Sequence, residues 1–163
     1  MFYPRLEGPA RQAYNDMVKG LWKEAENKIP KSQLIQRSLR AVDVGMTNPQ
    51  WTFNLTSTAT WNTLISDGTV PDNTFVGICG LFYPMITTQA VTEVRITKGG
   101  ADVAYWDVQG TNHLVDARIY VDDPITIREN EIINVQGYTI SASTEAITLI
   151  GTVVQRRGIL VSP

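Results

Sequence analysis

The chain has 163 residues, of which 43% are hydrophobic and 18% are charged. This balance excludes a disordered chain and suits one globular domain with an appendage. No stretch approaches the roughly 18 uninterrupted apolar residues of a membrane helix. Cys79 is the only cysteine, which excludes an internal disulfide and a cysteine cluster for a metal, and we expect it to be a small buried hydrophobe.

Charge divides the chain into two unlike parts. Residues 1–40 hold 8 basic and 4 acidic side chains, a net charge of +4, whereas the remainder holds 6 basic and 12 acidic, a net charge of −6. We therefore predict a basic N-terminal arm over residues 1–44 and an acidic β body over residues 45–163. An arm opposite in sign to its own body favours self-assembly, with each arm reaching a neighbour.

The arm begins with a strong helix signal. Gly8-Pro9 is a helix start and Pro30 is a stop, which predicts a helix over about residues 9–28. Apolar residues between them recur at spacings of three and four and form one stripe: Ala10, Ala13, Tyr14, Met17, Val18, Leu21, Trp22 and Ala25. This stripe either packs on the chain's own sheet or docks on another subunit, and the sequence favours neither. Binding to a membrane surface is disfavoured, because the polar face mixes both signs of charge.

A polar, basic tether follows over residues 31–40. Leu34, Ile35 and Leu39 recur within it at a spacing that allows a short second helix. The residues predicted to contact a neighbouring subunit lie on the helix and the tether: Tyr14, Met17, Leu21, Trp22, Arg37 and Arg40.

Residues 45–163 carry strand signals separated by turn signals. Gly99-Gly100 predicts a tight hairpin, residues 66–73 predict a turn, and Asp122-Asp123-Pro124 predicts the end of a strand. The expected strands are 51–56, 60–65, 74–81, 91–98, 101–106, 117–121, 125–127, 132–140 and 146–155. We expect a mainly β fold, an antiparallel β-sandwich or jelly roll of about eight strands with an N-terminal amphipathic helix.

The chain has little that resembles a catalytic site, and we predict that it is not an enzyme and takes no metal, cofactor or small-molecule substrate. His113 is the only histidine and lies in a loop-like context, so it cannot supply the set of histidines that a metal-dependent jelly-roll enzyme uses. Tyr120-Val121-Asp122-Asp123 imitates a polymerase motif without its context. Carboxylate pairs such as Glu129 with Glu131, and Asp102 with Asp107, occur in almost any sequence.

Two binding roles stay open. The basic arm predicts at most weak, non-specific contact with nucleic acid, because its net charge is modest. Trp51, Trp61, Trp106 and the tyrosines form a sugar-binding platform in a minority interpretation, because aromatic residues in alternating strands usually belong to a core or an interface.

The β body resembles the single jelly-roll capsid and capsid-decoration proteins of icosahedral bacterial and archaeal viruses. The resemblance is one of pattern. It is carried by the hairpin at Gly99-Gly100, the strand over residues 117–121 that runs into Asp122-Asp123-Pro124-Ile125, and the late apolar run over residues 149–158.

The resemblance implies a virion structural protein made in the host cytoplasm, whose partners are copies of itself and other shell proteins. In such families a terminal arm ties neighbouring subunits together. This arm departs from the strongly basic arms that package genomes, which favours contact with protein. The alternative is a carbohydrate- or receptor-binding β-sandwich module of a viral fibre or spike.

Overall fold

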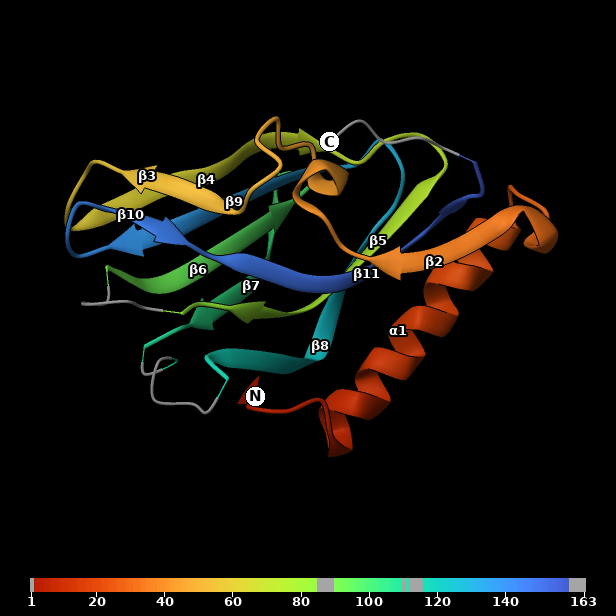
Figure 1. The fold of residues 1–163 in the computed structure, drawn as a ribbon, viewed down its shortest axis with the longest axis horizontal. Coiled ribbons are helices and arrows are strands. Elements are labelled where there is room, and N and C mark those ends of the chain that lie inside the picture. Colours follow the sequence, from red (N-terminus) through yellow and green to blue (C-terminus); the bar gives the residue numbers. More distant parts are fainter. Residues whose placement is uncertain (1, 85–89, 110, 112–115, 159–163) are drawn as a thin grey trace.

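The computed structural model describes residues 2–84, 90–109, 111 and 116–158, which are mainly β with one α-helix (Figure 1). A five-stranded sheet has the order β1-β8-β5-β11-β2, a four-stranded sheet has the order β4-β9-β6-β7, and β10 pairs with β3. The strands are β1 (Phe2–Tyr3), β2 (Leu34–Ser38), β3 (Thr52–Leu55), β4 (Thr60–Thr69), β5 (Thr74–Phe82), β6 (Val91–Lys98), β7 (Ala101–Asp107), β8 (Arg118–Ile127), β9 (Ile132–Thr139), β10 (Ser143–Ala146) and β11 (Thr148–Arg156).

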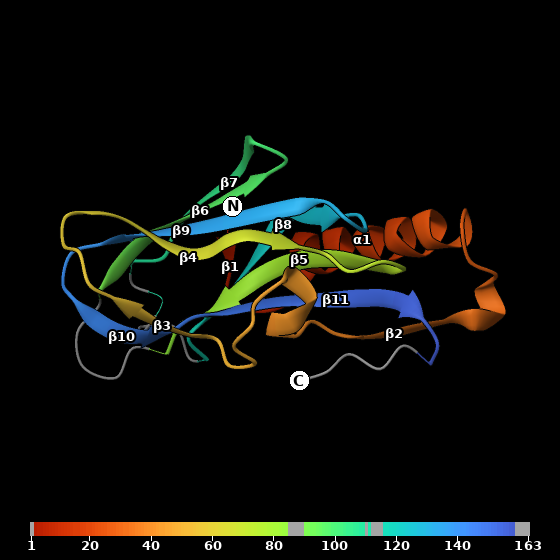
Figure 2. The same ribbon diagram turned by 90° about the horizontal axis from the view of Figure 1, so that it is seen from above.

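The strands pair in a nested order. β6 pairs with β7, β5 with β8, β4 with β9, β3 with β10 and β2 with β11, always antiparallel. The chain therefore forms one long antiparallel ribbon whose tip is the β6–β7 hairpin. Two further antiparallel pairings within this ribbon, β5 with β11 and β6 with β9, join its strands into the five-stranded and four-stranded sheets, while β3 and β10 remain a separate pair. Figure 2 shows β4 and β9 on one side of the molecule and β2 and β11 on the other.

Strand β5 is buried on both faces, which explains its continuous apolar sequence. Val76 and Ile78 belong to the main core, which also contains residues of the four-stranded sheet such as Val94. Phe75 and Cys79 point the other way, into a second cluster beneath the helix. The five-stranded sheet is thus covered on its outer face by the helix.

Helix α1 (Gly8–Glu26) confirms the predicted helix, with proline at its first turn. It packs on β8, β5 and β11 of the five-stranded sheet (Figure 1). The buried residues of the stripe are Ala10, Met17, Leu21 and Ala25. Of the two uses that the sequence left open for this stripe, the structure shows packing on the chain's own sheet.

The prediction of a second helix in the tether is wrong. Lys31–Gln33 forms a single 3-10 turn, and residues 34–38 form β2, which pairs with β11. Pairing with the exposed edge of β11 outweighs the local helical spacing, because it buries Leu34 beneath α1. A further 3-10 turn, η2 (Ala41–Val44), ends the segment.

Two predicted strand ends are also wrong. Strand β8 continues through Asp122-Asp123-Pro124, and its pairing with β5 slips there, between the pairs Ile78–Ile125 and Gly80–Tyr120. A bulge absorbs the extra residues, so a turn-like sequence stays inside the strand. Strand β4 likewise runs to Thr69 through register shifts with β9.

The hairpin prediction is confirmed. Gly99 and Gly100 have φ angles of 59° and 86°, in the left-handed region that glycine adopts without strain. β6 spans the predicted residues 91–98, and β7 extends the predicted strand by one residue. These two strands form the hairpin at the tip of the ribbon.

Candidate interaction surfaces

Helix α1 packs most closely on the five-stranded sheet at Gly77 of β5. A Cβ atom at this position would lie 2.5 Å from the Met17 sulfur and 3.0 Å from a Leu21 methyl carbon. The missing side chain therefore lets the helix approach the sheet closely. Met17 and Leu21, which the sequence predicted as subunit contacts, are 5% and 2% exposed here and are held by their own sheet.

Two other predicted contact residues lie at the margin of the contact between α1 and the sheet. Tyr14 and Trp22 are half-buried and pack against the cluster beneath α1. The Trp22 Nε1–H donates to the side-chain oxygen of Gln36 at 2.9 Å, which ties the helix to β2 at the rim of the sheet. Part of each aromatic surface remains open to a neighbour.

Arg37 of the tether is the centre of a polar network with Asp43 and Gln155. Its guanidinium donates to both carboxylate oxygens of Asp43, at 2.7 and 2.6 Å, and to the side-chain oxygen of Gln155 at 2.6 Å. The Asp43 side chain is fully buried and also accepts the Arg40 backbone N–H. Arg37 thus joins the tether to β11, whereas Arg40, the last predicted contact residue, is exposed.

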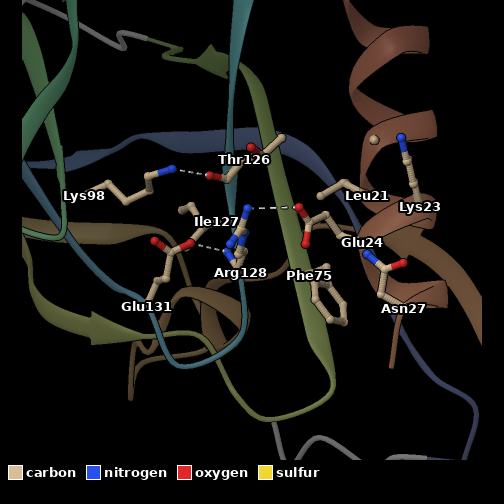
Figure 3. Close-up of a pocket in the computed structure, with 11 residues that line it drawn as sticks. Leu21, Lys23, Glu24, Asn27, Phe75, Lys98, Thr126, Ile127, Arg128 and Glu131 are labelled. Carbon is tan, nitrogen blue, oxygen red and sulfur yellow. Dashed lines mark hydrogen bonds and ion pairs between the residues drawn. The ribbon is translucent and has the colours of Figure 1, made fainter. Parts of the chain in front are cut away.

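A pocket of about 390 Å³ lies between the C-terminal half of α1 and the end of β8 (Figure 3). Leu21 and Phe75 form its apolar part. The Arg128 guanidinium reaches across it to Glu24 at 3.0 Å, and the Lys98 ammonium donates to the Thr126 carbonyl at 2.9 Å. The Arg128–Glu24 contact joins α1 to the end of β8, and the Lys98–Thr126 contact joins β6 to β8.

A second ion pair links Lys28, just after α1, to Glu129, just after β8. The Lys28 ammonium lies 2.7 Å from a carboxylate oxygen of Glu129, and this carboxylate also accepts the Asn73 backbone N–H at 2.6 Å. Hydrogen bonding from Lys28 is the main cause that lowers the pKa of Glu129 below its ordinary value, and partial burial opposes it. Glu129 therefore has a structural role.

The outer face of the four-stranded sheet carries an aromatic platform, which we define as Trp61, Arg95, Tyr105, Gln136 and Tyr138. The Trp61 ring meets Tyr105 and Tyr138 edge-on, at centroid distances of 5.8 and 5.5 Å. The Arg95 guanidinium lies 4.3 Å from the Trp61 ring centroid and donates to the Tyr105 hydroxyl at 3.0 Å. Gln136 accepts two hydrogen bonds from Arg95 and fixes its position.

The platform differs from the one considered from the sequence. Trp106 is 4% exposed and belongs to the core, and Trp51 packs against the core from its edge. Tyr105, one residue from Trp106, points outward and is 56% exposed. Because Val94 pairs with Trp106 and Arg95 with Tyr105, Trp106 faces the core and Tyr105 faces outward. The alternation of residues along β7 shows that Tyr105 and Trp106 lie on opposite faces. The sequence does not show which of these two faces is buried.

The residues considered for chemistry are dispersed. Cys79 is buried, as predicted, and burial raises the pKa of its thiol to about 11. Asp102 accepts the Thr97 hydroxyl and Asp107 accepts the Gln109 backbone N–H, which are local contacts. His113 lies outside the described residues. Within those residues, no three His, Cys, Asp or Glu side chains gather as a metal site would require.

Comparison of the chain with models of known protein families, and with curated proteins, finds no match. Across the part of the chain that the structure describes, no helix is both long and apolar enough to cross a membrane.

Proposed function

We propose that the chain is a virion structural protein, a single jelly-roll subunit of a capsid or of its decoration. The nested strand pairing is the observation that carries this proposal. If β2, β4, β5, β6, β7, β8, β9 and β11 are counted as the eight strands of a roll, the first pairs with the last, the second with the seventh, the third with the sixth and the fourth with the fifth. A jelly roll has this winding, and capsid proteins are among its users.

A fold alone does not define a function, so the surfaces must support assembly. The aromatic platform presents the exposed Tyr105 beside half-buried tryptophan, tyrosine and arginine side chains, the residue types that dominate protein–protein contacts. Tyr14 and Trp22 of α1 add a second half-buried aromatic area, over the five-stranded sheet. Two separate contact areas on one subunit are what a closed shell of identical copies needs. In this proposal the partners are copies of the chain and other shell proteins, and its location is the virion.

The structure changes how the arm would act. Met17, Leu21 and Arg37 stabilise the subunit itself, so subunit contact is left to the exposed parts of Tyr14, Trp22 and Arg40. Deleting the arm would uncover Phe75 and Cys79, and point variants are therefore the sharper tools. Negative-stain microscopy of the purified full-length chain tests the proposal. We expect regular rings, sheets or shells, and dispersed single molecules at all concentrations would contradict it.

The second candidate is a carbohydrate-binding module, favoured by the aromatic platform alone. Exposed aromatic rings with fixed polar groups beside them suit the apolar faces and hydroxyls of a sugar ring. Glycan-array binding that is lost in Tyr105→Ala, with the fold unchanged, would support this candidate. Tyr120→Ala is the matched control, because Tyr120 packs near the helix on the other sheet.

A further inference from the structure

Strand β2 forms the rim of the five-stranded sheet, and β11 pairs with only one of its edges (Figure 1). The Leu39 N–H donates to the Gly151 carbonyl and the Arg157 N–H donates to the Gln33 carbonyl. Because backbone groups alternate in direction along a strand, residues with odd numbers in this segment face β11. The backbone groups of Leu34, Gln36 and Ser38 therefore point outward.

Two of these outward groups already have partners. The Leu34 N–H donates to the Lys31 carbonyl, and the Ser38 carbonyl accepts the Arg37 guanidinium at 3.1 Å. Four groups remain: the Leu34 carbonyl, the Gln36 N–H and carbonyl, and the Ser38 N–H. No hydrogen bond within the described residues engages them.

We propose that β2 pairs antiparallel with β2 of a second copy, across a two-fold axis at Gln36. In this register Gln36 lies opposite Gln36 of the second copy, and their N–H and carbonyl groups exchange hydrogen bonds. Each Ser38 N–H donates to the opposite Leu34 carbonyl. The occupied Leu34 N–H and Ser38 carbonyl face each other, so every open group finds a partner. This self-complementarity is what a two-fold interface requires.

The side chains suit the same register. Ile35 lies opposite Arg37, so no like charges meet in the strand pair, and each Arg37 is already neutralised by Asp43. Gln36 and Ser38 are exposed, and Trp22 rests against Gln36. The two Trp22 rings therefore flank the axis and add apolar contact to the backbone pairing. The choice of a second copy as occupant rests on the proposed self-assembly, and the match of open with open groups supports it independently.

A disulfide test reads this register directly. In the proposed pair the two Gln36 Cα atoms lie about 5.5 Å apart, within the range that a disulfide spans. We expect Gln36→Cys to form a covalent dimer on mild oxidation. Ser38→Cys is the matched control, because the two copies of residue 38 would lie about 13 Å apart along the strands. The native Cys79 is buried and contributes no cross-link. Equal cross-linking of both variants would overturn the proposal.

A backbone test complements the disulfide. Gln36→Pro removes an outward N–H and leaves the bonds to β11 intact, so an edge strand tolerates it. Gln36→Ala loses the same side chain but keeps the N–H. We expect the dimer dissociation constant, measured by sedimentation with circular dichroism to monitor folding, to be on the order of tenfold or more weaker for the proline variant than for the alanine variant. Equal constants would overturn the proposal.

The two levels of the account fail separately. Regular particles from a chain whose Gln36→Cys variant does not cross-link would overturn the edge pairing and leave the shell role standing. Specific cross-linked dimers from a chain that never forms particles would support the edge pairing and count against the shell role.

Discussion

Arg37 donates hydrogen bonds to both carboxylate oxygens of Asp43, six residues further along the chain, and the Asp43 side chain is fully buried. Removing one member of a buried ion pair leaves an uncompensated charge, which is costly. We predict that Arg37→Met lowers the free energy of unfolding by about 3 kcal/mol, measured by chemical denaturation. Arg40→Met, at an exposed position, should change it by less than about 0.5 kcal/mol. Equal effects of both substitutions would show that the Arg37 network has no stabilising role.

Gly77 and Met17 should be energetically coupled. A valine at position 77 would push against the Met17 sulfur and force the helix outward, which we expect to cost about 2 kcal/mol. In a Met17→Ala background the space is open, so the same Gly77→Val change should cost much less. A double-mutant cycle by urea denaturation measures the coupling. Additive effects would contradict the close packing of α1 on β5.

The Lys28–Glu129 pair gives a pH dependence of known sign. The pKa of Glu129 is lowered in the folded chain from its ordinary value near 4.5, so the folded state favours the charged carboxylate. Its contribution is complete above about pH 5 and is lost as pH falls through the lowered pKa. We predict that Glu129→Gln costs about 1 kcal/mol at pH 7, and that its difference from the native chain shrinks toward pH 3. A difference that is constant with pH would contradict this role.

Cys79 should be unreactive while the chain is folded. Its thiol is buried, donates to the Ile150 carbonyl and has a pKa raised to about 11, so little reactive thiolate exists at pH 8. We expect a thiol reagent to label it only at the rate of unfolding, and rapidly in denaturant. Fast labelling of the native chain would show that the cluster beneath α1 opens readily.

Local signals in the sequence predicted the local elements well. Pro9 and the apolar stripe located α1, and Gly99-Gly100 located the β6–β7 hairpin, because each depends on residues close in sequence. Strand β2 was missed because its partner β11 lies more than a hundred residues away. The Asp122-Asp123-Pro124 bulge was missed for the same reason, since only the pairing with β5 shows that the strand continues.

The candidate surfaces follow this division. The sequence identified the apolar stripe of α1, but only the sheet beneath it shows that Met17 and Leu21 point inward while Trp22 stays at the margin. The sequence placed Arg37 among the subunit-contact residues, whereas it pairs with the buried Asp43, which lies just beyond the residues 1–40 whose charges were counted. The self-complementary edge of β2 depends on hydrogen-bond direction, which no residue pattern contains.

Sedimentation of the purified full-length chain over a wide concentration range tests the central claim, self-association, most directly. The account predicts a mass that rises from one chain to a dimer and then to larger, regular assemblies, with the dimer weakened in Gln36→Pro. A mass of one chain at every concentration would contradict it.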